Sequence, residues 1–101
     1  MPWSISKFKI TKIIPDTATA KENFKFKVIG EDIPQYVTLE FISGSYRVKA
    51  DPIEVIYEDE SGGNSQIHGN VTLENSGIYT VTASVESEGK PISSSINMEV
   101  K

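Results

Sequence analysis

His68 is the residue best suited to acid–base chemistry, because it is the one histidine in this chain of 101 residues. A Ser-His-Asp triad would place it beside a serine nucleophile, yet the Gly-x-Ser-x-Gly pattern that exposes such a serine is missing. With no Cys, thiol nucleophiles, Cys–His dyads and Cys-based metal sites are excluded. We therefore predict a protein without catalytic residues and interpret His68 as a surface histidine on a strand near a loop.

Five acidic residues between positions 51 and 60 are the candidates for a cation site. Carboxylate oxygens are the ligands that Ca²⁺ prefers, but the cluster lacks the Asp-x-Asp-x-Asp-Gly spacing that wraps an ion in one loop. We therefore predict a solvated acidic loop, no metal ligands and no cofactor. The cluster comprises Asp51, Glu54, Glu58, Asp59 and Glu60.

The charge is unevenly distributed along the chain. Residues 1–30 carry six Lys and two acids, whereas residues 51–101 carry two bases and nine acids. A net charge of −4 argues against nucleic acid as a partner, since modules that bind phosphates are usually basic. The lysines predict a basic stripe that either steers an acidic partner or protects an edge strand from pairing. They are Lys7, Lys9, Lys12, Lys21, Lys25 and Lys27.

The N-terminal residues, Met1–Lys9, lack a basic stretch followed by the apolar run of a signal peptide. The chain also contains no apolar run of about 18 residues, the length that predicts a membrane-spanning helix. We therefore expect synthesis in the cytoplasm without a signal peptide and no insertion into a membrane. An extracellular location is expected if the sequence is a module of a longer protein.

Apolar and polar residues alternate in short segments that are separated by turn residues, which predicts β-strands. A break at Pro15-Asp16 predicts a broken edge strand, and a turn over Glu88–Pro91 predicts a closing hairpin. Seven to nine short strands in about 100 residues are typical of an antiparallel sandwich of two sheets. We predict one all-β domain over residues 1–101, with strands near residues 4–13, 23–29, 36–42, 46–50, 53–57, 67–73, 78–85 and 92–100.

The segment Asn75–Ala83 resembles the immunoglobulin signature Asp-Ser-Gly-x-Tyr-x-Cys-x-Ala. In this resemblance Tyr79 occupies the tyrosine corner, while Val28 and Val81 replace the two Cys residues and Leu39 replaces the core Trp. The resemblance implies a Greek-key immunoglobulin-like sandwich close to the intermediate set, in which apolar packing replaces the cross-link. Loss of the Cys pair suits a domain that folds in a reducing cytoplasm, or a bacterial or bacteriophage domain.

The alternation also predicts a flat outer face that is rich in hydroxyl groups and nearly uncharged. Interfaces disfavour charge at their centres and favour Tyr, so this face is a candidate surface for a protein or glycan partner, with Tyr36 as its anchor. The alternative is an ordinary solvated sheet face. Trp3 either caps the sandwich or anchors the chain to a partner. The predicted face comprises Tyr36, Thr38, Glu40, Ile42, Ile78, Thr80, Thr82, Ser84, Ser93, Ser95 and Asn97.

These observations favour a non-enzymatic module for binding or structure. Our first hypothesis is an accessory protein that decorates a phage capsid or virion and mediates attachment or adhesion. The alternative is one module of a longer adhesin, filament or muscle-type immunoglobulin array. The hypothesis of a phage protein rests on analogy and on an amino-acid composition rich in Lys, Ile, Ser and Asn, which is typical of AT-rich genomes.

Overall fold

The computed structural model describes residues 8–58, 63–87 and 89–101, which form nine β-strands and no helix. The strands are β1 (Lys9–Ile14), β2 (Thr17–Ala18), β3 (Asn23–Glu31), β4 (Thr38–Ser43), β5 (Tyr46–Ala50), β6 (Ile53–Tyr57), β7 (Asn64–Thr72), β8 (Gly77–Ser87) and β9 (Lys90–Val100). The longer strands follow the period-two alternation of the sequence, as in β3 and β9, whereas β1 departs from it at a register shift between Ile10 and Lys12. None of these elements is a helix long and apolar enough to cross a membrane.

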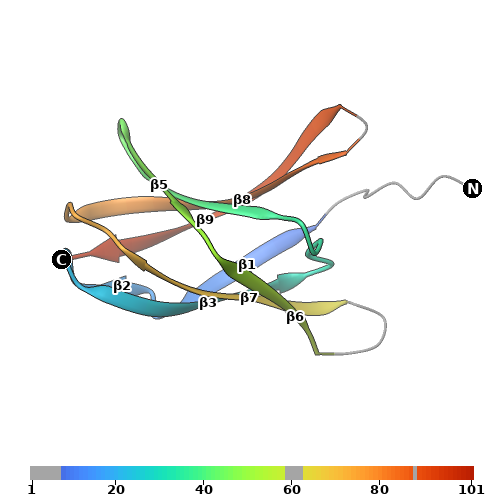
Figure 1. Ribbon diagram of the computed structural model, residues 1–101, viewed down its shortest axis with the longest axis horizontal. Coiled ribbons are helices and arrows are strands. Elements are labelled where there is room, and N and C mark those ends of the chain that lie inside the picture. Colours follow the sequence, from blue (N-terminus) through green and yellow to red (C-terminus); the bar gives the residue numbers. More distant parts are fainter. Residues whose placement is uncertain (1–7, 59–62, 88) are drawn as a thin grey trace, which may run out of the picture.

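Two sheets pack face to face, with strand orders β1-β3-β7-β6 and β2-β9-β8-β4-β5. Figure 1 shows the two layers edge-on, with the chain crossing from β5 in the upper layer to β6 in the lower one. In the letters of the immunoglobulin fold these orders are A-B-E-D and A′-G-F-C-C′. The predicted fold class, an immunoglobulin-like antiparallel sandwich with Greek-key connections, is therefore confirmed by the strand order.

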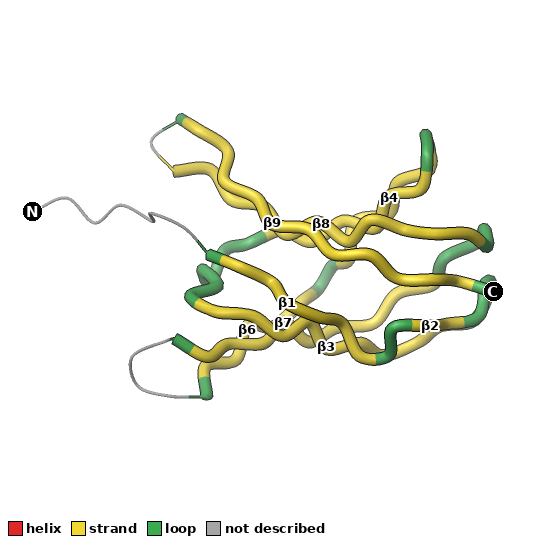
Figure 2. Tube along the Cα trace, turned by 180° about the vertical axis from the view of Figure 1, so that it is seen from behind, coloured by secondary structure: helices red, strands yellow, loops and turns green. Residues whose placement is uncertain are grey.

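The first predicted strand is divided between the two sheets. β1 pairs with β3 in an antiparallel ladder, and after Pro15 the short β2 pairs with β9 in a parallel one. Figure 2 shows β1 and β2 following one another along the same edge of the sandwich. Because Pro15 has no N–H to donate, a break in the ladder at this position costs no hydrogen bond. The predicted start of this strand at residue 4 lies outside the described residues.

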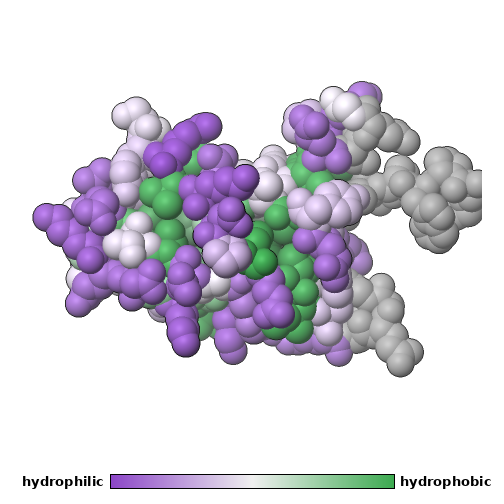
Figure 3. Space-filling model, viewed as in Figure 1, coloured by the Kyte–Doolittle hydropathy of each residue, from purple (hydrophilic) through white to green (hydrophobic). Residues whose placement is uncertain are grey.

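Both sheets contribute apolar side chains to one core. Phe24, Phe26 and Phe41 meet inside it, with ring centroids 6.4 Å apart for Phe24–Phe41 and 5.3 Å apart for Phe26–Phe41, both edge to face. Val28, Val81 and Leu39, the residues at the Cys and Trp positions of the resemblance, are each 0% exposed. Figure 3 shows hydrophobic residues, in green, reaching the surface along the edge where β5 passes to β6.

Most predicted boundaries differ from the structure by one or two residues, as for β4, which begins at Thr38, and two of the differences change a loop. The closing hairpin has a shorter turn, because β8 and β9 pair up to Ser87 and Lys90, so that Pro91 lies inside β9 opposite Glu86. Gly89, with φ of 77°, takes a left-handed conformation that glycine adopts without a steric penalty. β7 begins at Asn64, three residues before the predicted position, because Asn64–Gln66 continue the ladder with β3. The rest of the predicted acidic loop, residues 59–62, lies outside the described residues.

Candidate interaction surface

The predicted hydroxyl-rich face is assembled by the register of β9, β8, β4 and β5. We call this surface the hydroxyl face. Thr80, Thr82 and Ser84 on β8 lie opposite Ile42, Glu40 and Thr38 on β4. On their other side the same three residues lie opposite Asn97, Ser95 and Ser93 on β9. Antiparallel register partners point to the same side of a sheet, so these nine side chains share one face.

The polar side chains of the hydroxyl face hydrogen-bond to one another across strands. Thr82 Oγ1 and Ser95 Oγ are 2.9 Å apart, and Thr38 Oγ1 and Ser84 Oγ are 3.0 Å apart. Cross-strand hydroxyl pairs of this kind stabilise a sheet and hold each side chain in one position. The face therefore presents a fixed pattern of hydroxyl groups, each of which retains capacity for a further hydrogen bond.

The sequence prediction that this face is nearly uncharged is wrong. β5 pairs with β4 and places Arg47 opposite Ile42 and Lys49 opposite Glu40. The predicted face included no residue of β5 and therefore left out both cations. The signal was present, because Tyr46, Val48 and Ala50 alternate with Arg47 and Lys49 and face the core. The hydroxyl face thus has uncharged hydroxyl groups along β8 and β9, both cations at its β5 margin, and Glu99 of β9 opposite Ile78 at one end.

Tyr36 lies just before β4 and is 65% exposed, the most exposed large hydrophobic side chain of the described residues. It lines a shallow hollow of about 390 Å³ at one end of the hydroxyl face. The opposite end carries Ile78, which is 62% exposed. Trp3, the second predicted anchor, lies outside the described residues. The hollow is lined by Tyr36, Thr38, Ser84, Val85, Glu86 and Pro91.

His68 lies on β7, on the outer face of the other sheet, opposite Lys27 of β3 and Glu54 of β6. Its Nε2 is 2.7 Å from Gln66 Oε1, and Gln66 in turn donates from Nε2 to the Glu58 carboxylate. His68 Nε2 therefore donates to the amide oxygen in a chain of side chains along the sheet surface. This partner positions the ring within the surface network and does not activate a nucleophile.

The nearest serine along β7 lies on the opposite side of the strand from His68, whereas two members of the acidic cluster, Glu54 and Glu58, lie on the same sheet near His68. Ser65 faces the core, is 1% exposed and accepts a hydrogen bond at 3.1 Å from the Ile33 N–H. Of the predicted acidic cluster, Asp51, Glu54 and Glu58 are described, while residues 59 and 60 are not. Across the described ranges, no three His, Cys, Asp or Glu side chains are grouped so that they could hold a metal ion.

Tyr79 occupies the corner position expected from the immunoglobulin resemblance. It is 0% exposed, and its hydroxyl donates to the Asn75 carbonyl at 2.6 Å. Tyr46, which the sequence analysis did not single out, packs edge to face on it at 6.2 Å and accepts at 3.0 Å from the Glu74 N–H. Two tyrosines therefore hold the turn before β8. Burial raises the pKa of Tyr79, and Tyr46 adds to the increase.

Replacement of Tyr79 by Phe is expected to lower the free energy of unfolding by about 1 to 2 kcal/mol. The variant keeps the ring and loses one buried hydrogen bond, leaving the Asn75 carbonyl without this donor. Urea denaturation at neutral pH measures the loss. No change in the denaturation midpoint would contradict the role of the corner hydrogen bond.

Alkaline pH supplies the control for this variant. The raised pKa of Tyr79 means that its contribution to stability is complete below pH 10.0 and is lost as the pH rises through the higher folded-state value. The difference in stability between the two proteins should therefore shrink above pH 10.0. Burial also raises the pKa of Tyr57, so both proteins should lose stability in this range, and only the difference is diagnostic.

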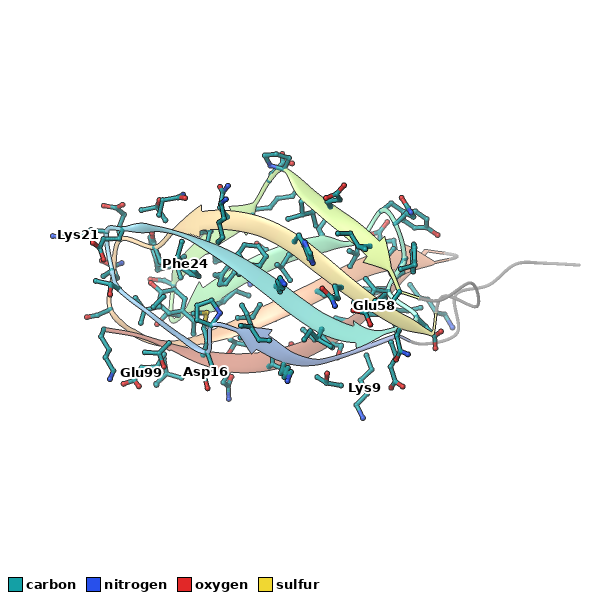
Figure 4. The ribbon with its side chains drawn as sticks, turned by 90° about the horizontal axis from the view of Figure 1, so that it is seen from below. Lys9, Asp16, Lys21, Phe24, Glu58 and Glu99 are labelled. Carbon is teal, nitrogen blue, oxygen red and sulfur yellow. The ribbon has the colours of Figure 1, made fainter. Side chains whose placement is uncertain are left out.

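Four of the six predicted stripe lysines share the outer face of one sheet. Figure 4 looks onto the outer face of the β1-β3-β7-β6 sheet and shows Lys9 and Lys21 at its opposite ends. Lys25 and Lys27 lie on β3, and Lys12 lies on the neighbouring β1 opposite Ile29. Lys7 lies outside the described residues. Lys9 lies opposite Glu31, so that Lys9, Lys12, Lys25 and Lys27 lie along the outer face of the β1–β3 edge, while Lys21 lies just before β3.

Comparisons with known proteins identify no family for this chain. No family model matches the sequence, and no curated protein matches it. Among solved structures, the chain is similar to the M1 domain from titin, with 17% sequence identity and a TM-score of 0.36. That similarity covers 99% of this chain and 96% of the titin domain. The immunoglobulin-like fold of this chain is established by its own strand order and register.

Proposed function

We propose that this immunoglobulin-like module is a non-enzymatic binding protein whose hydroxyl face docks onto a protein or glycan surface. The observation that carries the proposal is the continuity of this face with the exposed ring of Tyr36 and the hollow beside it. Exposed Tyr is enriched in interfaces, because one rigid ring offers a large contact area and a hydroxyl. The preformed hydroxyl pairs add hydrogen-bonding groups that do not need to be ordered on binding.

The hollow beside Tyr36 suits a saccharide or a polar loop. Thr38 and Ser84 place hydroxyls on one side of it, and Glu86 places a carboxylate on the other. An aromatic ring flanked by hydroxyl and carboxylate groups can stack on an apolar sugar face and bond to its hydroxyl groups. Such a surface fits attachment to an assembled particle such as a virion, which is the partner we propose.

The double variant Tyr36→Ala with Thr80→Glu tests the hydroxyl face. Both side chains are exposed, so the melting temperature should stay within a few degrees of the wild type. Binding should fall by about tenfold or more, because a ring that anchors the interface is removed and a charge is placed at its centre. Binding is measured on an array of neutral glycans and on intact particles from the source.

Asn23→Glu is the matched control for this experiment. It adds the same charge at an exposed position on the outer face of the other sheet and should leave binding unchanged. A photo-crosslinker at position 82 should capture the partner, and one at position 23 should not. Equal loss of binding in the double variant and the control, or retained binding in the double variant, would overturn the assignment of this face.

An array module is the second candidate function, and the positions of the chain ends favour it. In Figure 1 the start of β1 and the C-terminus lie at opposite ends of the sandwich. Ends at opposite poles allow successive domains to be joined without folding back. The intact mass of the natural protein distinguishes the two candidates: 11.1 kDa supports a stand-alone accessory protein, and a larger mass supports an array.

A further inference from the structure

Lys25 and Lys27 form a pair of cations on the outer face of the β1-β3-β7-β6 sheet. Both side chains are exposed and point the same way, because they lie two residues apart on β3. Their register partners on β7 are not carboxylates, namely Asn70 opposite Lys25 and His68 opposite Lys27. On the β1 side, Lys27 lies opposite Ile14. The pair therefore has no carboxylate directly across either neighbouring strand.

A hollow of about 520 Å³ lies among these residues. Its β1 side is apolar, since Ile14 is 46% exposed and is followed by the exposed Pro15. The bottom of the hollow is formed by Phe26 and Gly69, a register pair that faces the core. The lining residues are Ile14, Pro15, Lys25, Phe26, Lys27, Glu54, His68, Gly69 and Asn70.

Two carboxylates lie at the margins of this surface. Glu54 is on β6, two strands from Lys27 and thus about 10 Å across the sheet. Asp16 lies beyond the end of β1, at the lower rim in Figure 4. The basic pair of the hydroxyl face differs in this respect, because Lys49 lies directly opposite Glu40. The two lysines of β3 thus keep a local positive field in a protein of net charge −4.

We propose that this surface, which we call the basic hollow, binds an extended acidic peptide segment that carries an apolar side chain. Positions i and i+2 of an extended chain are about 7 Å apart, so Lys25 and Lys27 match two carboxylates at the same spacing. Ile14 lies directly opposite Lys27 on β1, so an apolar side chain that flanks the two carboxylates can contact Ile14 and Pro15 where the segment leaves β3 toward β1. The basic hollow is on the opposite sheet from the hydroxyl face and constitutes a second site, independent of the proposed function.

The test uses a fluorescent synthetic peptide with the sequence Leu-Ser-Glu-Ser-Glu-Ser-Leu, which puts both Glu and both Leu on one side. Fluorescence anisotropy should show binding that weakens as salt is added. Lys25→Glu with Lys27→Glu should weaken binding by about tenfold or more, because attraction becomes repulsion at both contacts. Ile14→Ser should weaken it by about three- to tenfold through the loss of apolar contact.

Arg47→Glu with Lys49→Glu is the matched control, with the same spacing, the same change in charge and the opposite sheet. It should change the affinity by less than about twofold, since the two faces are on opposite sides of the sandwich. A peptide with Gln in place of Glu should bind about tenfold more weakly than the acidic peptide. Absence of binding by the wild type, equal losses in both double variants, or binding of a sulfated glycan but not of the peptide would overturn the proposal.

Discussion

Phe41→Ala is expected to lower the free energy of unfolding by about 3 to 5 kcal/mol, one of the two largest effects that we predict. Phe41 is 0% exposed in the centre of β4 and makes edge-to-face contacts with Phe24 and Phe26 of the opposite sheet. Truncation would remove both ring contacts and leave a cavity that two paired sheets cannot close. Urea denaturation measures the loss as a shift of the midpoint at constant slope.

Phe24→Ala is the control, because Phe24 is only half-buried and contacts the same ring. Its cavity would open toward solvent, so the loss should be clearly smaller than for Phe41. Domains of this size are stable by about 5 to 15 kcal/mol, and Phe41→Ala should therefore leave a small margin. A loss below about 1 kcal/mol for Phe41→Ala would contradict the central position of this ring in the core.

Gly30→Ala is expected to destabilise the protein by about 2 to 3 kcal/mol. Gly30 is buried near the end of β3, opposite Ile10 of β1. A Cβ at this position would overlap the carbonyl oxygen of Lys9 and would approach Ile10 Cα and Ile33 Cδ1 to 3.0 Å. Because the obstacle is backbone, the strand β1 itself would have to move. Thermal and urea denaturation of the purified variant measure the effect.

Gly69→Ala is the comparison for this prediction. A Cβ there would meet Phe26 Cζ at 2.9 Å and Ile53 Cγ2 at 3.2 Å, and both of these atoms belong to side chains. Side chains can shift by tenths of an ångström more readily than a paired strand, so the loss should be about 1 kcal/mol. A larger loss for Gly69→Ala than for Gly30→Ala would show that the β1–β3 edge yields more easily than the core.

The strands themselves could be predicted from the sequence, because alternation is a local property. The segments predicted at residues 46–50 and 53–57 coincide with β5 and β6, and 23–29 lies within β3. The alternation places Val37, Leu39 and Phe41 on one side, and all three are buried. The boundaries at Asn64 and Pro91 differ because they are set by ladder partners on neighbouring strands, which the local pattern does not contain.

The sequence by itself determined the fold class, the two sides of the regularly alternating strands, and the absence of Cys chemistry, whereas in β1 a register shift between Ile10 and Lys12 breaks the alternation. The period-two pattern shows which residues share one side of a strand, but it does not show which strands are neighbours. Only the tertiary structure decided that β5 adds Arg47 and Lys49 to the hydroxyl face, and that Lys25 and Lys27 meet Ile14 and His68 around a hollow. The physical reason is that these surfaces are built by pairing between strands up to about fifty residues apart in the chain.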